Sequence, residues 1–388
     1  MLQDVSRQKL VLILGTKRLI VMKIGLITIH HANSYGGTLQ AFATQVALSK
    51  YGEVNIIDYK SPALSKTMCL MRVGLKPRDI LRMGKDLFRL FPRYRLLKKF
   101  QAFARDNFKL TESFTDADQM FALDKEFDVF VTGSDQIWNP NIVDKLDAAY
   151  LLAFAAQSKK ISFASSAGSY RFSESEKEIL AQCLGEFDHL AVREEDTASF
   201  LSALLGGRQI SHVLDPTLLL TKDDWISQLQ LSQPKNDSSR YLLVYTLKKD
   251  DLVRRVIIDI ANRLKMSVVA IDQDPFLGYP ADDHRMDASP RDFVSLVSGA
   301  AMMITNSFHG TTFAVNFGIP FVSVKPESGL NRMQGFLRSV DLESRLITRV
   351  EEVDGALASP VSFDDANKAL HLLREDSFKY LDNALRLN

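Results

Sequence analysis

Short apolar runs alternate with longer helical patterns along this chain. The first run, residues 24–29, is followed by a helical pattern over 38–51 and a second run over 54–58. Apolar runs of this length, separated by helices, are typical of parallel strands that helices cover on both faces. The pattern therefore predicts a β–α–β unit and, with it, a parallel doubly wound sheet of the α/β class.

The same alternation continues and predicts two domains. Strands are expected at 127–132, 160–165, 189–192, 241–245, 267–271, 300–305 and 321–324, with helices between most of them, and 213–217 is expected to hold one more strand and a proline-fixed turn. A polar stretch, 228–240, has the composition of a linker. A chain of 388 residues is also longer than one ordinary core requires. We assign 22–226 to a first Rossmann-like domain, 240–346 to a second, and 347–388 to a helical tail.

The first 21 residues precede the first strong strand and are interpreted as an N-terminal extension, with Met22 as the expected native start. Their apolar run resembles a signal peptide only superficially. Lys17 and Arg18 interrupt it, and no cleavage site of small residues follows.

Composition and charge narrow the classes of function. Hydrophobic residues make up 46% of the chain, charged residues 24%, and the net charge is +1. These values are typical of a globular protein and give no indication of nucleic-acid binding. Cys69 and Cys183 lie far apart and have neither metal nor redox spacing. We therefore expect a cytoplasmic protein without a bound metal or cofactor.

One stretch departs from this even charge. Residues 72–105 contain eleven Lys or Arg against two Asp, interleaved with Leu, Ile and Phe, which predicts an amphipathic helical insertion. One interpretation is a solvated basic face that covers the core. The other is peripheral contact with an anionic membrane, at its inner face, or with a lipid-linked pyrophosphate.

The sharpest chemical signal is residues 303–320, where a short apolar strand leads through a polar turn into a helix expected to start at Thr311. Unpaired N–H groups at a helix start suit an anion, and the carboxyl ends of parallel strands are where such folds bind ligands. His309 lies in the turn and can exchange a proton near neutral pH. The alternative is a histidine that only caps the helix or satisfies a buried carbonyl.

Loops after the other expected strands carry further candidates. Arg193 follows the run 189–192, and its planar guanidinium suits a carboxylate or a phosphate. Asp215, within 213–217, is interpreted as structural. The full set of candidate binding residues is Asn33, Gly36, Gly37, Ser134, Asp135, Asn306, Ser307, Gly310, Thr311, Lys325 and Arg332.

Several of these segments together resemble the polysaccharide pyruvyl transferase family. They are Asn33-Ser34-Tyr35-Gly36-Gly37-Thr38-Leu39-Gln40, Gly133-Ser134-Asp135-Gln136-Ile137-Trp138, Val192-Arg193-Glu194, Asp215-Pro216-Thr217 and Ser307-Phe308-His309-Gly310. Each is weak alone, but their order and spacing over Met22 to Leu346 are fairly specific. The resemblance implies a fold similar to GT-B glycosyltransferases, with two Rossmann-like domains facing a cleft.

The resemblance also implies a reaction and its residues. The enolpyruvyl group of phosphoenolpyruvate would move onto two hydroxyls of a sugar, giving a cyclic ketal and phosphate. Arg193 matches the family's donor-site arginine and His309 its histidine, so both are expected to be catalytic. Many members have an arginine two residues before that histidine, where this chain has Ser307, so one anion contact is either missing or supplied from elsewhere, with Lys325 and Arg332 as candidates.

These expectations describe a transferase of surface-polysaccharide biosynthesis, of the exopolysaccharide or capsule type. The donor would be phosphoenolpyruvate, and the acceptor a glycan or a lipid-linked saccharide. A GT-B-type glycosyltransferase using a nucleotide sugar is the first alternative. A ligand-binding relative that has lost catalysis is the second, and the Ser307 departure favours it.

Overall fold

The computed structural model describes residues 21–71, 84, 88–232, 241–327, 329–358 and 363–386. Apart from Val21, the expected N-terminal extension lies outside these residues. Residues 72–83 and 85–87 of the basic stretch and 233–240 of the expected linker also lie outside them. Within the described part, no helix is long and apolar enough to span a bilayer.

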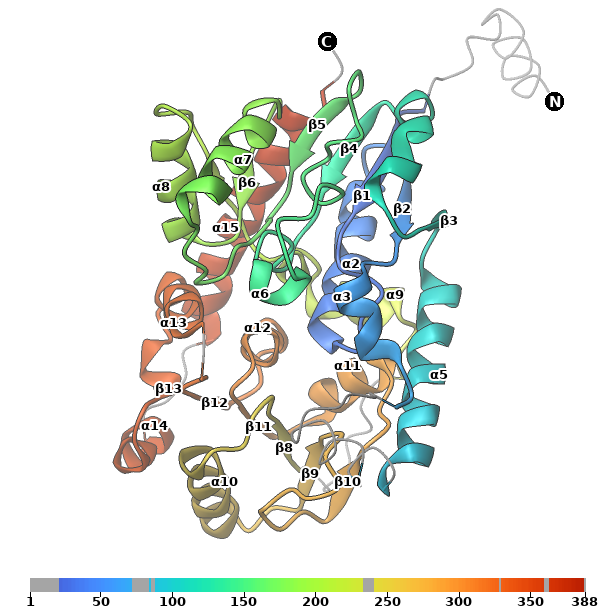
Figure 1. Ribbon diagram of the computed structural model, residues 1–388. Coiled ribbons are helices and arrows are strands. Elements are labelled where there is room, and N and C mark those ends of the chain that lie inside the picture. Colours follow the sequence, from blue (N-terminus) through green and yellow to red (C-terminus); the bar gives the residue numbers. More distant parts are fainter. Residues whose placement is uncertain are drawn as a thin grey trace, which may run out of the picture.

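Two parallel sheets form the centres of two domains, one above the other in Figure 1. The first has the order β3-β2-β1-β4-β5 and the second the order β10-β9-β8-β11-β12-β13. The bounds are β1 (Lys23–Ile27), β2 (Glu53–Tyr59), β3 (Leu110–Phe114), β4 (Val129–Thr132), β5 (Lys159–Ser162), β8 (Leu242–Tyr245), β9 (Val268–Ile271), β10 (Asp283–Arg285), β11 (Met302–Thr305), β12 (Phe321–Val324) and β13 (Leu346–Ile347). The α/β class with two Rossmann-like domains is confirmed.

Helices flank both sheets, as crossovers between parallel strands require (Figure 1). They are α2 (Tyr35–Leu48), α3 (Pro62–Ser65), α5 (Leu90–Asn107), α6 (Pro140–Val143), α7 (Glu174–Gly185), α8 (Glu195–Leu204), α9 (Lys222–Gln228), α10 (Asp251–Leu264), α11 (Pro290–Gly299), α12 (Phe308–Phe317), α13 (Leu330–Ser339), α14 (Val353–Ala358) and α15 (Phe363–Ala384). A short parallel pair, β6 (Ala191–Val192) and β7 (Ser211–His212), continues the first sheet through single bridges such as Ser165 with Val192.

The segment 213–217 was expected to hold one more strand and a proline-fixed turn; the turn is present, but β7 ends at His212 and residues 213–214 are not a strand. Instead, Asp215 caps the 3₁₀ turn η3 (Pro216–Leu218), and its carboxylate accepts a hydrogen bond from the Thr217 N–H. Pro216 explains the difference, because its fixed φ suits the first position of a helical turn and it has no N–H for a strand ladder. The turn directs the Asp215 side chain into the space between the domains.

The two domains share one continuous apolar core, to which both sheets and their facing helices contribute. At its centre Tyr35 of α2 stacks on Phe293 of α11, with ring centres 5.0 Å apart, and donates a hydrogen bond to the Ala288 carbonyl. The helix α15 returns to the first domain, where the Tyr380 hydroxyl donates to the Ser162 carbonyl (Figure 1). These contacts hold the facing loops of the two sheets in a defined relative position.

Candidate active site

The helix α12 brings His309 to the interface between the domains. It begins at Phe308, three residues earlier than expected, because the Ser307 side chain caps it by accepting from the Gly310 N–H at 3.3 Å. His309 therefore lies in the first helical turn. Thr311 points the other way, into the core, where its hydroxyl contacts that of Ser323 at 2.7 Å.

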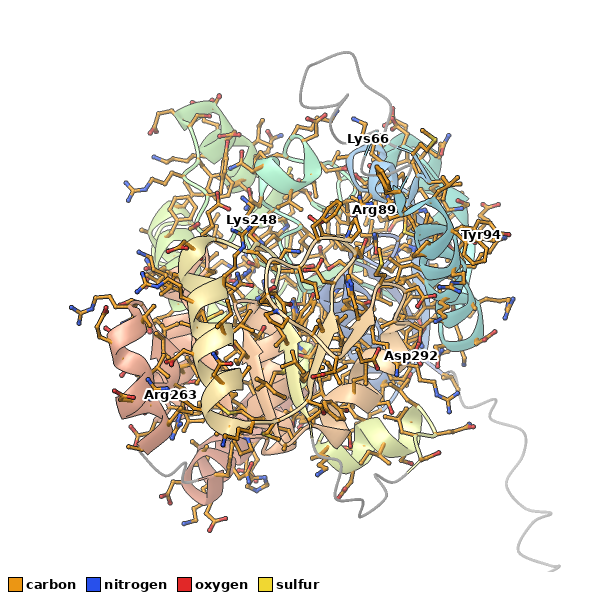
Figure 2. All side chains as sticks on the ribbon, turned by 90° about the horizontal axis from the view of Figure 1, so that it is seen from below. Lys66, Arg89, Tyr94, Lys248, Arg263 and Asp292 are labelled. Carbon is orange, nitrogen blue, oxygen red and sulfur yellow. The ribbon has the colours of Figure 1, made fainter. Side chains whose placement is uncertain are left out.

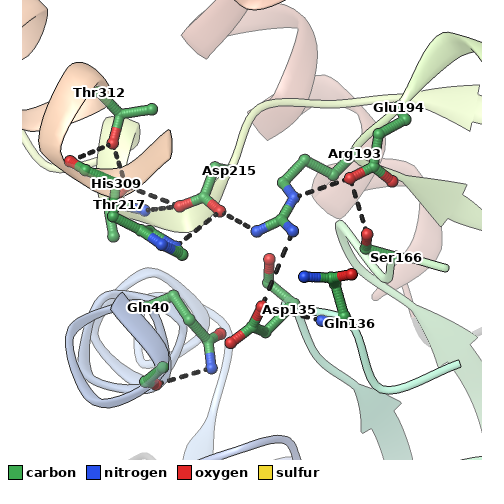
Figure 3. Close-up of polar contacts among 12 residues, drawn as sticks. Gln40, Asp135, Gln136, Ser166, Arg193, Glu194, Asp215, Thr217, His309 and Thr312 are labelled. Carbon is green, nitrogen blue, oxygen red and sulfur yellow. Dashed lines mark hydrogen bonds and ion pairs between the residues drawn. The ribbon is translucent and has the colours of Figure 1, made fainter. Parts of the chain in front are cut away.

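Arg193 follows β6 and is enclosed by carboxylates. Its Nη1 donates to Asp215 Oδ2 at 2.5 Å and its Nε to Glu194 Oε1 at 3.2 Å, while Nη2 lies 3.8 Å from Asp135 Oδ1 (Figure 3). Only 2% of the side chain is exposed. Burial alone would lower the pKa of Arg193, but the three carboxylates raise it, so the guanidinium stays charged. Its Nη2 makes no hydrogen bond with the described residues.

Asp215 connects Arg193 to His309, a role that the sequence interpretation missed. Its Oδ2 accepts from Arg193 and lies 3.5 Å from His309 Nε2, a separation suited to an ion pair rather than to a normal hydrogen bond. Its Oδ1 accepts from the N–H and hydroxyl of Thr217 at 2.9 and 2.6 Å. Burial would raise the pKa of Asp215, but His309, Arg193 and Thr217 hold that pKa well below its usual range. The carboxylate is therefore ionised at neutral pH.

The first domain approaches His309 through the glycine pair at the start of α2. A side chain at position 36 would place its Cβ only 2.1 Å from His309 Nδ1, so the imidazole lies directly against the Gly36 backbone. A Cβ atom added at Gly37 would lie 3.4 Å from Oδ2 of Asp135, so this glycine lies beside that carboxylate. The motif was expected to let backbone approach a ligand, and in this structure it lets α2 approach the histidine of the other domain.

Arg332, on α13, faces the same region from the second domain. Its guanidinium lies 4.7 Å from the centre of the Phe308 ring, and that of Arg193 lies 5.0 Å from the same ring. Burial lowers the pKa of Arg332, and the nearby charge of Arg193 lowers it further. The Nε atom makes no hydrogen bond within the described part of the chain. An anion between these two guanidinium groups would relieve their repulsion and satisfy free N–H groups.

Arg193, Asp215 and Arg332 border a cavity of about 1140 Å³ between the domains, and His309 lies behind Asp215 rather than in the lining itself. Its inner wall includes Arg193, Asp215, Phe308 and Arg332. Its outer wall comes mainly from α7, α8, α13 and α15 and the loop before α7, and includes Tyr170, Arg171, Phe172, Lys177, Phe200, Gln334 and Arg338. The cavity therefore has a charged inner end and a broader outer part with aromatic and polar side chains.

The remaining sequence candidates lie at or near this region in other roles. Asn33 exchanges two hydrogen bonds with Gln273 across the domains, at 2.7 and 3.1 Å. Asn306 holds the loop after β8 by accepting from the Leu247 N–H and donating to the Lys248 carbonyl. Ser134 is fully buried. Lys325 is exposed and does not border the cavity, so of the two proposed replacement cations only Arg332 does.

The arrangement combines a cationic, anion-accepting wall with a histidine held beside an ionised carboxylate. This combination can bind a multiply charged anion and move a proton next to it. Among the described residues, no three His, Cys, Asp or Glu side chains gather as metal ligands would.

Solved structures with a similar fold include the following three. The UDP-N-acetylglucosamine 2-epimerase of Neisseria meningitidis, bound to UDP-GlcNAc, is 10% identical, with 93% of this chain and 99% of that chain covered and a TM-score of 0.51. A putative epimerase of Listeria monocytogenes is 11% identical over 90% and 91% of the chains, with a TM-score of 0.49. MnaA of S. aureus with UDP is 12% identical over 93% and 92%, at 0.49.

Likeness at such low identity shows the fold alone, which is the two-domain GT-B-like arrangement. No curated protein matches the chain by sequence. The family comparison is more specific, because the sequence model of one family matches residues 35–328, from the first turn of α2 to the loop before α13. This span contains the segments that carry Arg193, Asp215 and His309. The chain belongs to the polysaccharide pyruvyl transferase family.

Proposed function

We propose that the protein transfers the enolpyruvyl group of phosphoenolpyruvate onto two hydroxyls of a sugar in a surface-polysaccharide precursor. The observation that carries this proposal is the single carboxylate of Asp215 that Arg193 and His309 share, at the inner end of the cavity. A donor with a carboxylate and a phosphate needs cations, and its transfer needs a proton donor and acceptor. Both requirements meet at this carboxylate.

The donor would be anchored by the guanidinium groups of Arg193 and Arg332, which both lie over the Phe308 ring. Arg193 is largely neutralised by three carboxylates, so it offers mainly its unpartnered Nη2. Arg332 makes no ion pair with a carboxylate of the described residues, and burial and the charge of Arg193 lower its pKa despite the more distant Glu194, Asp135 and Asp215. We therefore assign Arg332 the principal anion contact and the start of α12 a supporting one. No further cofactor enters this scheme.

The proton balance of ketal formation assigns a task to His309. Protonation of the methylene carbon makes the neighbouring carbon electrophilic, and one hydroxyl adds to it. Loss of phosphate and attack by the second hydroxyl then close the ketal. The two hydroxyls release two protons, of which one ends on the new methyl group and the other on phosphate. His309, with Asp215 balancing its imidazolium form, is positioned to carry these protons.

The acceptor would occupy the outer part of the cavity. The rings of Tyr170 and Phe172 lie 5.1 Å apart at an edge-to-face angle, and Gln334 contributes an amide nearby. Aromatic faces and amides suit sugar rings, which are apolar on their faces and polar at their edges. A glycan or lipid-linked saccharide fits this lining, in a protein that works in the cytoplasm at the inner face of the membrane.

A thermal-shift titration tests the donor assignment. A ligand present at 100 times its Kd stabilises the folded state by about 2.7 kcal/mol, so phosphoenolpyruvate should raise the melting temperature clearly. Arg332→Gln should weaken that binding about 10- to 100-fold, because a hydrogen bond to a charged group contributes about 1.5–3 kcal/mol. Lys325→Gln is the matched control and should bind like the wild type, because Lys325 does not border the cavity.

The same titration with UDP and GDP distinguishes the alternatives. Stabilisation by a nucleoside diphosphate and not by phosphoenolpyruvate would replace the proposal with a nucleotide-sugar glycosyltransferase. Phosphoenolpyruvate binding without phosphate release, when lipid-linked saccharides are supplied as acceptors, would indicate a ligand-binding relative instead. Arg193→Ala is a poor probe, because it would leave three buried carboxylates without their cation.

A further inference from the structure

The outer face of α5 carries aromatic side chains that no part of the described chain covers. Phe88, immediately before the helix, is 78% exposed, Phe91 66% and Tyr94 49%. They are spaced three residues apart and so lie on one side of the helix. Figure 2 shows Tyr94 at the outer edge of the molecule. Three large exposed rings in succession are unusual on a water-facing helix, because such surface is normally buried.

The opposite side of α5 explains why these rings remain outside. Leu96, Leu97, Phe100 and Phe103 are buried and pack into the protein, so the helix already has one complete apolar stripe. The exposed rings form a second stripe. This outer face continues along the helix with polar and basic side chains, Lys98, Gln101 and Arg105. The helix therefore has two apolar stripes: one packs against the core, and the other is exposed beside polar and basic side chains.

Cations surround the exposed rings. The Arg95 guanidinium lies 4.8 Å from the centre of the Phe91 ring, and the Lys98 ammonium 5.7 Å from that of Tyr94. Apart from the buried Arg93, α5 carries four cations (Arg95, Lys98, Lys99 and Arg105), and the carboxylates paired with them are three (Asp106, Asp287 and Asp292). The face therefore has a positive excess beside exposed aromatic surface.

We propose that this α5 face, defined by Phe88, Phe91, Tyr94, Lys98 and Arg105, docks on the surface of an anionic phospholipid bilayer. Rings of this type enter the boundary between headgroups and acyl chains, and Lys and Arg beside them attract anionic headgroups. The positive excess favours an anionic lipid surface over an uncharged glycan, and the exposed rings favour a surface that they can enter. This inference goes beyond the proposed reaction and does not depend on it.

Docking through α5 would orient the cavity, because the helix is attached to both domains. Its inner stripe packs in the core that the two domains share. Arg95 pairs with Asp287 of the second domain at 2.6 Å, and the Lys99 ammonium donates to the Asp287 carbonyl at 2.8 Å. A bilayer bound to the α5 face would therefore hold the whole two-domain body in one orientation.

Co-sedimentation of the full chain with vesicles tests the proposal. Vesicles of phosphatidylglycerol mixed with phosphatidylcholine should bind the wild type, and vesicles of phosphatidylcholine alone should bind it much less. Phe91→Ser with Tyr94→Ser should lower the partition coefficient at least tenfold. Lys98→Gln with Arg105→Gln should lower it about thirtyfold, the equivalent of about 2 kcal/mol at about 1 kcal/mol for each surface cation.

Matched controls on another exposed helix separate this face from general surface effects. Leu372→Ser and Lys379→Gln change exposed side chains of α15 and should leave vesicle binding unchanged. Thermal melting and donor binding should remain normal in all variants, because every substituted side chain is exposed.

Three results would overturn the proposal. The first is equal binding of wild type and α5 variants, and the second is binding of the wild type to neither kind of vesicle. The third is light scattering that shows the α5 variants disrupting an oligomer, which would make the face an interface between copies of this chain. Loss of vesicle binding with intact phosphoenolpyruvate binding would show that docking and donor recognition are separate properties.

Discussion

Asp215→Asn keeps the size and shape of a fully buried side chain and removes its charge. The wild-type carboxylate accepts on both sides, from Thr217 on Oδ1 and from Arg193 on Oδ2. An amide can accept on one side only, so its NH₂ group must face donors on the other. The variant therefore disturbs the pair with His309 and Arg193 while leaving Arg193 its contacts with Glu194 and Asp135.

The magnitude follows from the distance between Asp215 and His309. Two unit charges 3.5 Å apart attract by about 5 kcal/mol at an effective dielectric constant of about 20. Arg193 shares the same carboxylate oxygen and reduces this value. A loss of about 3–5 kcal/mol from the step in which His309 is protonated corresponds to a fall in kcat of about 10²- to 10⁴-fold. Donor binding should not weaken, because the cavity loses a negative charge beside an anionic ligand.

Steady-state kinetics with varied phosphoenolpyruvate separate these two effects. We expect kcat to fall by the stated amount while KM for phosphoenolpyruvate is unchanged or lower. Thr217→Val is the matched control, because it removes one hydrogen bond to Asp215 and keeps the charge; it should retain kcat within a few-fold. A fall in kcat of less than tenfold, or a KM that rises in parallel with it, would refute the role given to Asp215.

Two further predictions concern the approach of the domains and the effect of acid. Gly36→Ala should lower kcat about 10²-fold by displacing the His309 ring. Gly355→Ala is the control and should not lower kcat, because a Cβ added at Gly355 meets open space. Near-wild-type kinetics of Gly36→Ala would contradict the contact between Gly36 and His309. The unfolding free energy should fall as pH drops below about 4, because the unfolded carboxyls, near pKa 3.9, take up protons before the folded ones. Asp215 contributes with a lowered folded pKa, and so does Asp58: burial would raise the pKa of Asp58, but His30 and Lys60 together lower it to about 2. Urea titrations from pH 7 to pH 3 should show a shallower decline for Asp215→Asn than for the wild type; equal slopes would count against it.

The fold was largely predictable from the hydrophobic pattern, since buried parallel strands need continuous apolar runs and crossover helices need periodic ones. The errors lie where polar capping decides the conformation. Ser34 caps α2 and Ser307 caps α12, so both helices start three residues before the positions that periodicity indicated. At 213–217 the apolar start of the segment suggested a strand, but Asp215 and Pro216 set a 3₁₀ turn.

The site was predictable only in part, because its geometry depends on contacts between distant segments. Arg193 and His309 stand out by residue type, and the structure places both near one carboxylate. Asp215 was interpreted as structural because an aspartate before a proline is a common turn residue. Nothing in a local pattern indicates that this turn faces a helix of the other domain. The segment Asp215-Pro216-Thr217 was nevertheless among the motifs shared with the family, which was the available signal.

The Ser307 departure has a physical consequence for how the donor is held. Ser307 is buried and its hydroxyl caps α12, so its side chain is directed into the fold rather than into the cavity. An arginine at this position would extend from the start of the same helix that carries His309. In this chain a cation instead comes from α13, across the Phe308 ring, on which Arg332 stacks. Because α13 belongs to the second domain, as α12 does, the replacement leaves Arg332 and His309 in the same domain. Under the proposed function the donor would still be held near His309, so the change in position need not change the reaction.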